Sequence, residues 1–203
     1  MKKNIKEMDV VFLLDRSGSM RGAEEDTIGG YNSFLEKQKK NKYKTNITTI
    51  LFDNYYEVLH DRVDAKDVKK ITDKDYYVRG CTALYDAIGK TISNIERKAE
   101  NVIFVITTDG LENSSKEYTK DMIKDLIKKH SDWEFMYIGA DIDSYEGGTA
   151  IGINRSNIAN YKKDKKGTSL LFDSVYEYAE CIYKGESTSN WKKKLDDYLD
   201  ENK

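Results

Sequence analysis

The sequence predicts an α/β fold with a doubly wound, mainly parallel central sheet, one antiparallel edge strand and helices on both faces. Two apolar runs, residues 10–14 and 102–106, show no polar alternation, which is typical of strands covered on both sides. Strand-like and helix-like segments alternate along the chain, and this order favours parallel pairing through crossover helices. The 203 residues suffice for one domain with a sizeable core.

The first part of the chain predicts one strand, one helix and a hairpin. The strand at 10–14 is followed by apolar residues at helical spacing through 28–40, although two glycines interrupt that pattern. Residues 47–52 and 55–63 are expected to be strands because they are rich in β-branched and aromatic side chains. Only two residues connect them, so we expect a hairpin that supplies the antiparallel edge.

The middle of the chain predicts two helices around a central strand. Apolar residues at helical spacing mark a helix at 84–99, which leads into the strand at 102–106. Ser114 and Glu117 have the spacing of a capping box, so a second helix is expected over 115–130.

The last part of the chain predicts a strand, a loop, an edge strand and a helix, at 133–139, 141–155, 156–162 and 168–183 respectively. The loop contains glycines and has room for one helical turn. The remaining tail keeps apolar side chains at helical spacing among charges, and it either caps the domain or docks on a partner. We therefore expect a domain at residues 1–188 and an amphipathic C-terminal helix or tail at 189–203.

Composition excludes several classes of function. A net charge of −2 with 34% charged residues gives no basic excess, so nucleic acid is not an expected partner. No apolar stretch approaches the roughly 20 residues of a membrane span, and no export signal is visible at the N-terminus. Cys81 and Cys181 lack metal-ligand spacing and are expected to be free thiols, as in a reduced, cytoplasmic protein.

Five polar side chains are placed at the ends of these elements. They are Asp15, Ser17 and Ser19 after the first strand, Thr82 ahead of the helix at 84–99, and Asp109 after the strand at 102–106. If the two strands are neighbours where the strand order reverses, all five side chains lie on one rim of the sheet. The simpler alternative is that each residue caps a loop or a helix on its own.

These five side chains offer only oxygen atoms, which are the ligands that small hard cations prefer. Gly18 lets the loop turn between the two serines, so that neighbouring hydroxyls can face one ion. We therefore expect a Mg²⁺ site, with Mn²⁺ or Ca²⁺ as alternatives. Because hydroxyls are neutral, the cation keeps charge with which to attract an acidic group from outside.

Three segments, 15–19, 80–88 and 106–110, resemble the motifs of the von Willebrand factor type A (VWA) domain with its metal-ion-dependent adhesion site. That pattern is Asp-x-Ser-x-Ser, a separate Thr and a separate Asp. The resemblance extends over residues 9–183, in the order of the family's elements, and it implies the Rossmann-like VWA fold.

The resemblance also implies roles for the five side chains. Ser17 and Ser19 would bind the metal directly, Asp15 and Asp109 would act directly or through water, and Thr82 would join in the ligand-bound arrangement. An Asp or Glu of a protein partner would fill the remaining metal position, which makes a binding module rather than an enzyme. The chain looks more like the intracellular bacterial stand-alone members than like an extracellular adhesin.

Residues beside the motifs depart from the family or add charge. Cys81 stands where the family often has a second glycine, and a space-filling role is favoured over redox control. Arg16 and Arg21 flank the site and are expected to be solvated, with recruitment of an acidic partner as the alternative.

Two other functions stay open at this point. A metal-dependent phosphohydrolase would use the same cation, but the sequence has neither a Walker-type loop nor an evident base. His60 and His130 are both expected to be structural. A metal-independent scaffold would use the tail or the loop at 141–155 as its contact surface.

Overall fold

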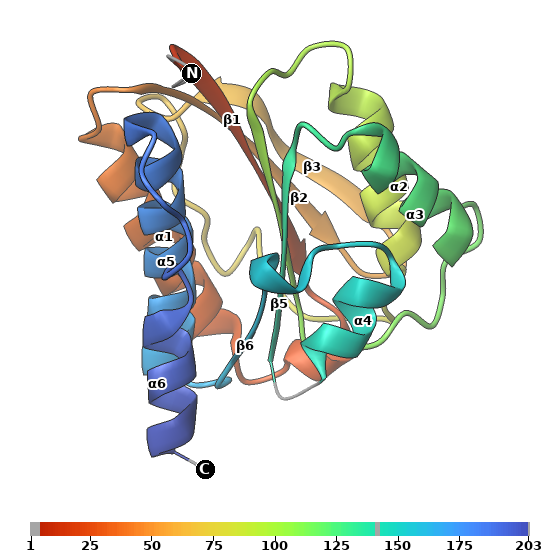
Figure 1. Ribbon diagram of the computed structural model, residues 1–203. Coiled ribbons are helices and arrows are strands. Elements are labelled where there is room, and N and C mark those ends of the chain that lie inside the picture. The colour runs from red at the N-terminus through yellow and green to blue at the C-terminus, as the bar shows by residue number, and fades with distance from the viewer. Residues whose placement is uncertain (1–4, 141–142, 203) are drawn as a thin grey trace.

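A central sheet of six strands organises the protein, described here by a computed structural model of residues 5–140 and 143–202. The strand order is β3-β2-β1-β4-β5-β6 (Figure 1). Neighbouring strands are parallel, except that β2 and β3 form an antiparallel hairpin at one edge. The strands are β1 (Glu7–Asp15), β2 (Lys44–Phe52), β3 (Tyr56–Asp64), β4 (Val102–Thr108), β5 (Glu134–Ala140) and β6 (Ile158–Tyr161). The predicted fold class is confirmed.

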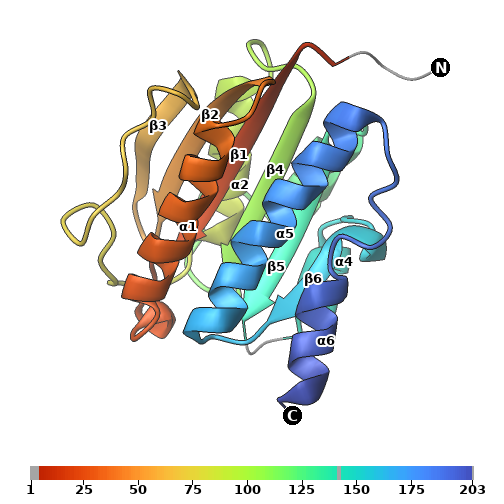
Figure 2. The same cartoon turned by 90° about the vertical axis from the view of Figure 1, so that its left-hand side faces the viewer.

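Helices cover both faces of the sheet. One face carries α1 (Glu24–Lys39), α5 (Lys165–Lys184) and α6 (Lys193–Glu201), as Figure 2 shows. The other face carries α2 (Leu84–Ile95), α3 (Lys120–Lys129) and α4 (Ser144–Ala150) (Figure 1). Two single-turn helices lie in the loops of the described residues, η1 (Gly18–Met20) after β1 and η2 (Arg155–Asn157) before β6.

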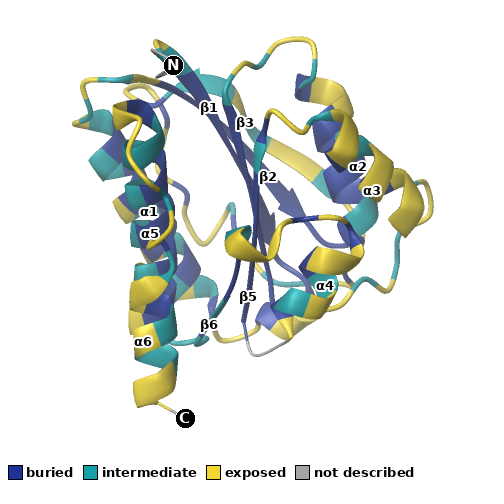
Figure 3. Ribbon diagram, in the orientation of Figure 1, coloured by how far each residue is buried: buried dark blue, intermediate teal, exposed yellow. Residues whose placement is uncertain are grey.

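The central strand β1 is buried on both sides, which explains its uninterrupted apolar sequence (Figure 3). The Phe12 ring faces the α1 layer and lies 4.9 Å from the Phe34 ring in an edge-on contact. On α1, a Cβ at Gly30 would lie 2.5 Å from the Phe172 ring of α5. The glycines that interrupt the helical pattern therefore include one that lets two helices approach closely.

The helix expected at 115–130 begins later than its sequence pattern suggests. Its N-cap is Thr119, and Ser114 does not form the predicted capping box. The physical reason is that carboxylates from elsewhere bind the intervening backbone: Glu112 accepts from the Ser114 N–H at 2.8 Å, and Asp86 of α2 accepts from the N–H groups of residues 116–118. Those N–H groups thus have partners outside a helix, so the predicted start was wrong.

Two further boundaries differ from expectation. The helix expected at 84–99 ends at Ile95. The loop expected at 141–155 starts at two residues that lie outside the described part of the chain, and it contains α4, which is longer than one turn. Asp143 caps α4 by accepting from the Tyr145 and Glu146 N–H groups.

The C-terminal tail packs on the rest of the chain. Trp191 and Leu195 are 5% and 1% exposed, and the Trp191 indole donates to the Ser156 carbonyl at 2.8 Å. The Tyr198 hydroxyl donates to Asp164, the N-cap residue of α5, at 3.0 Å. The division of the chain at residue 188 stays a prediction. No helix in the described residues is long and apolar enough to cross a bilayer.

Candidate metal centre

The carboxyl ends of β1 and β4 meet at one edge of the sheet. The two strands are adjacent and parallel, with Leu14 opposite Thr107. Because β1 lies between β2 and β4, the strand order reverses at this point. Loops at such a point leave the sheet in opposite directions and open a crevice for ligands. Asp15 ends β1 and Asp109 follows β4, so the predicted placement of both carboxylates on one rim is confirmed.

Asp15 is fully buried and held by hydrogen bonds. Its Oδ1 accepts from the Ser17 N–H at 2.7 Å, and its Oδ2 accepts from the Thr108 hydroxyl at 2.6 Å. Burial raises the pKa of Asp15 to about 6, and the charge of Asp109 adds to the rise, while these hydrogen bonds oppose it. A buried carboxylate of this kind is stabilised by any cation beside it.

The hydroxyls converge on the second carboxylate. Ser17 Oγ lies 3.0 Å from Ser19 Oγ, and the Ser19 hydroxyl donates to Asp109 Oδ1 at 2.5 Å. A Cβ built on Gly110 would lie 2.9 Å from Thr82 Oγ1 and 3.3 Å from Ser19 Oγ. The absence of a side chain at Gly110 therefore leaves a small space bordered by hydroxyls from two loops. The structure brings the five predicted residues together, and their donors fit a small hard cation.

Backbone hydrogen bonds fix the loop that carries the serines. The Gly18 N–H donates to the Gly80 carbonyl at 3.0 Å. Gly80 has a φ of +68°, and a Cβ there would lie 2.3 Å from the Asn54 amide oxygen, so this position requires glycine. Asn54 accepts in turn from the Cys81 N–H at 2.7 Å, and Asn113 accepts from the Thr82 N–H at 2.9 Å. Thr82 is thus positioned by two neighbouring loops.

Arg16 is a structural residue, and the expectation that it is solvated was wrong. Its side chain is fully buried, and its Nε donates to Asp53 at 3.0 Å. Glu57 lies 2.7 Å from another nitrogen of the same guanidinium, and Arg79 also donates to Asp53, at 2.6 Å. Paired carboxylates offset the cost of burying this charge. Arg21, in contrast, is exposed.

Cys81 also differs from its expected role. Its side chain is exposed, so it does not fill space beside Thr82. Cys181 is partly buried, and both cysteines are free thiols. The histidines match the structural role expected for them, since His60 lies 3.0 Å from Thr49 Oγ1 and His130 lies 3.3 Å from Glu96.

Lys163 is a member of this site that sequence reasoning missed. Its ammonium donates to Asp109 Oδ2 at 2.9 Å and to the Ser19 carbonyl at 3.0 Å. It lies between β6 and α5, where another strand of the parallel sheet ends on the same edge. The available signal was a lysine directly after an expected edge strand, at 156–162, but the sequence does not reveal how far that loop lies from β1.

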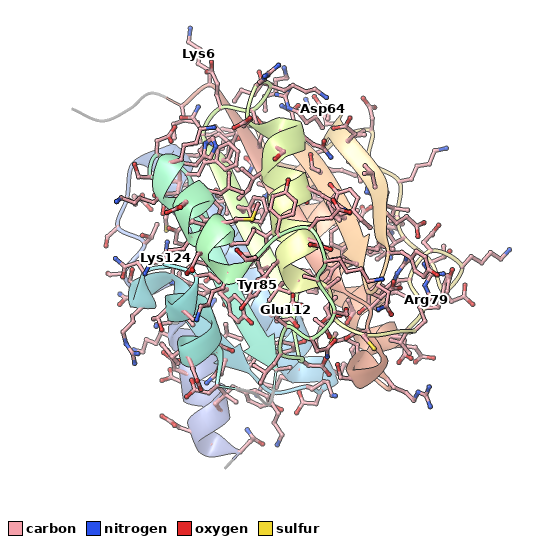
Figure 4. The ribbon with its side chains drawn as sticks, turned by 90° about the vertical axis from the view of Figure 1, so that its right-hand side faces the viewer. Lys6, Asp64, Arg79, Tyr85, Glu112 and Lys124 are labelled. Atoms are coloured by element: carbon pink, nitrogen blue, oxygen red, sulfur yellow. The ribbon has the colours of Figure 1, made fainter. Side chains whose placement is uncertain are left out.

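Large exposed apolar side chains gather around the same edge. Tyr55, Tyr77 and Leu111 are 68%, 44% and 64% exposed. The Arg79 guanidinium lies 5.0 Å from the Tyr55 ring centre and 5.3 Å from that of Tyr77. Figure 4 shows Arg79 on the far side of α2 from Lys124. We call Tyr55, Tyr77, Arg79 and Leu111 the aromatic rim.

The loop after Asp109 is held against α2. Glu112 accepts from the Tyr85 N–H at 2.9 Å and from the Ser115 hydroxyl at 2.7 Å, and Figure 4 shows Glu112 beside Tyr85.

Two of the five proposed site residues carry carboxylates, and the other three carry hydroxyls. No group of three or more His, Cys, Asp or Glu side chains suited to a metal occurs among the described residues.

Comparison with solved structures identifies the fold. Proximal thread matrix protein 1 from the mussel byssus matches with a TM-score of 0.64 and 18% identity over 85% of this chain and 46% of its own. The VWF domain of the pilus tip protein Mfa5 from Porphyromonas gingivalis matches with a TM-score of 0.66 and 12% identity, over 85% of this chain and 95% of that one. VWA2 from Sulfolobus acidocaldarius, an ArnB paralog, matches with a TM-score of 0.59 and 19% identity, over 85% of this chain and 45% of that chain.

These likenesses show that the chain has the VWA fold. Neither protein-family models nor curated proteins give a match. One structure of the byssus protein has zinc in its MIDAS, the metal-ion-dependent adhesion site. That structure matches this chain with a TM-score of 0.65 and 17% identity, over 88% of this chain and 47% of that chain. The chain spans less than half the length of the byssus protein.

Proposed function

We propose that this chain is a metal-dependent protein-binding module that captures an acidic side chain of a partner protein at a divalent cation. The convergence of five oxygen-bearing side chains from three separate loops is the observation that carries this proposal. The proposed ligands are Asp15, Ser17, Ser19, Thr82 and Asp109. Separate capping roles would explain each residue alone, but not the approach of the Ser19 and Thr82 hydroxyls from two loops to the space beside Gly110.

The donor set favours Mg²⁺, with Mn²⁺ or Ca²⁺ as alternatives. Carboxylate and hydroxyl oxygens are hard ligands, and Mg²⁺ is usually bound through one or two carboxylates and keeps other positions for water or ligand. The bound cation would supply positive charge for an incoming carboxylate. Ser17 and Ser19 would contribute neutral oxygens, which leave much of that charge uncompensated. Ser19 is exposed, so the site opens to solvent on its side.

The surroundings of the site support a protein as the partner. The aromatic rim exposes tyrosine and arginine side chains on loops at the same edge of the sheet as the proposed ligands, and these residue types are enriched at the centres of protein interfaces. Structural neighbours of the chain include pilus and adhesion proteins, such as the pilus adhesin SpaC from Lactobacillus rhamnosus GG. Those neighbours support a binding role in general.

Binding is favoured over catalysis by the positions of the titratable groups. His60, in β3, contacts Thr49 of β2, and His130, at the end of α3, contacts Glu96, so both side chains make contacts away from the site. Asp15 and Asp109 are the proposed metal ligands, so neither is available as a general base. We further propose a cytoplasmic role, because free thiols at Cys81 and Cys181 suit a reducing compartment.

Direct metal titration tests this proposal. Calorimetry should detect Mg²⁺ binding to the wild-type protein, and Asp109→Ala should abolish it because the variant removes a charged ligand. Asp125→Ala is the matched control, since Asp125 is an exposed acid on α3. Proteins retained on the immobilised chain in Mg²⁺, and released by chelator, should be lost with the Asp109 variant and kept with the control. Retention of the same proteins in chelator would refute the metal-bridged function.

A further inference from the structure

We infer that Lys163 is an internal competitor for the cation: its ammonium occupies Asp109 and must leave when a divalent cation binds. This inference rests on the proposed metal site. It assigns Lys163 a role in setting how tightly the site binds metal. Lys163 lies outside the three motifs that resemble those of the VWA domain.

Within the described residues, the hydrogen bonds of Lys163 lie at the proposed site. Its ammonium donates to Asp109 Oδ2 and to the Ser19 carbonyl, at 2.9 and 3.0 Å. The Asp109 carboxylate is only 2% exposed, whereas the lysine side chain is 25% exposed. Lys162, its neighbour, instead reaches the Asn202 carbonyl at 3.4 Å. The pairing is therefore selective for one lysine of the loop.

The remaining Asp109 oxygen is also occupied. Oδ1 accepts from the Ser19 hydroxyl at 2.5 Å, so both carboxylate oxygens have hydrogen-bond donors within the protein. A divalent cation that used this carboxylate would face a positive charge already bound to it. Like charges at contact distance repel strongly in a partly buried site, where water screens them less. Metal binding and the Lys163–Asp109 pair thus oppose each other.

The backbone around Lys163 is fixed, so the side chain itself has to move. The Asp164 N–H donates to the Lys162 carbonyl at 2.8 Å, and the Asp164 side chain caps α5 through the Gly167 N–H at 2.7 Å. A Cβ at Gly167 would lie 2.1 Å from the Lys162 carbonyl oxygen, which shows how closely the helix start packs on this loop. The flexible four-carbon stem of lysine can release the ammonium without disturbing that packing.

Lys163→Met tests the inference because it removes the charge and keeps the apolar stem. We expect calorimetric titration to show Mg²⁺ affinity about tenfold higher in Lys163→Met than in the wild type, as expected when a charge-assisted competitor is lost. Lys165→Met is the matched control, since it removes the same charge from an exposed position two residues away. Its affinity should stay within about twofold of wild type because salt screens exposed charges at longer range.

Thermal unfolding gives a second readout that does not depend on partner binding. In chelator, Lys163→Met should unfold at a lower temperature than wild type because Asp109 loses its counter-charge. Excess Mg²⁺ should raise the unfolding temperature of Lys163→Met by more than it raises the unfolding temperature of the wild type. If Lys163→Met does not fold, Lys163→Gln serves in both measurements. Equal or weaker Mg²⁺ affinity in the variant would overturn the inference and leave the metal site standing, whereas no binding by either protein would overturn both.

Discussion

Replacing Asp15 with asparagine should stabilise the metal-free protein while it removes a proposed metal ligand. The reason lies in the burial that raises the pKa of Asp15 to about 6. Asparagine keeps the shape of the side chain. The Thr108 hydroxyl can accept from its amide because the same hydroxyl can donate to the Gly110 carbonyl, 3.0 Å away. The hydrogen-bond network therefore survives the change.

The size of this effect follows from the titration of Asp15. Its pKa is higher in the folded state than in the unfolded chain, so the folded protein holds the proton more tightly. Stability therefore falls as the pH rises through the window from 3.8 to about 6, and it stays low above that window. The rise in pKa corresponds to about 3 kcal/mol. Asp15→Asn should gain up to about this amount near pH 8, and the gain should vanish near pH 4.

Urea unfolding in chelator, followed by circular dichroism near pH 4, 6 and 8, measures this difference. Asp125→Asn is the control for loss of an exposed carboxylate. Excess Mg²⁺ near pH 8 should stabilise the wild type and leave Asp15→Asn unchanged, because the variant lacks the charged ligand. An Asp15→Asn protein less stable than wild type near pH 8 would refute the reasoning, and so would a gain that persists near pH 4.

Two further substitutions probe the small space and the pH dependence. Gly110→Ala should weaken Mg²⁺ binding about tenfold or more by calorimetry, because its methyl group enters the space next to Thr82 Oγ1. Gly29→Ala, whose Cβ meets nothing within 4 Å, is the control, and unchanged affinity in Gly110→Ala would mean that the ion does not use this space. Burial lowers the pKa of His60 below 6.5, so its stabilising contribution is present above pH 6.5 and is lost as the pH falls through the lowered pKa. His60→Gln should therefore lose less stability than wild type between about pH 7.5 and 5 in urea titrations, and identical profiles would contradict this assignment.

The fold and the five site residues were predictable because their signals are local. An apolar run without alternation indicates a strand covered on both sides, and a polar residue at its end must lie on the rim of the sheet. Asp15 and Asp109 follow such runs directly. Their meeting required only that β1 and β4 be neighbours, and these two strands meet where the strand order of a doubly wound sheet reverses.

The features that were missed depend on contacts between distant segments. Arg16 is buried because Asp53, in the turn between β2 and β3, and Glu57, on β3, compensate its charge, and no local pattern indicates that pairing. Lys163 belongs to the site because β6 ends on the same edge, which depends on the complete strand order. The start of α3 shifted because Asp86, on a separate helix, binds the N–H groups that would have begun it.

The exposed thiol of Cys81 gives the protein a natural attachment point for a reporter dye. It lies between Gly80 and Thr82, so a fluorophore there would lie close to the proposed ion and to the surface proposed to bind the partner. Burial raises the pKa of the Cys181 thiol, which slows its reaction with maleimides relative to an exposed cysteine. Brief labelling at neutral pH should therefore modify one position preferentially, and occupancy of the site could be followed by emission without engineering the chain.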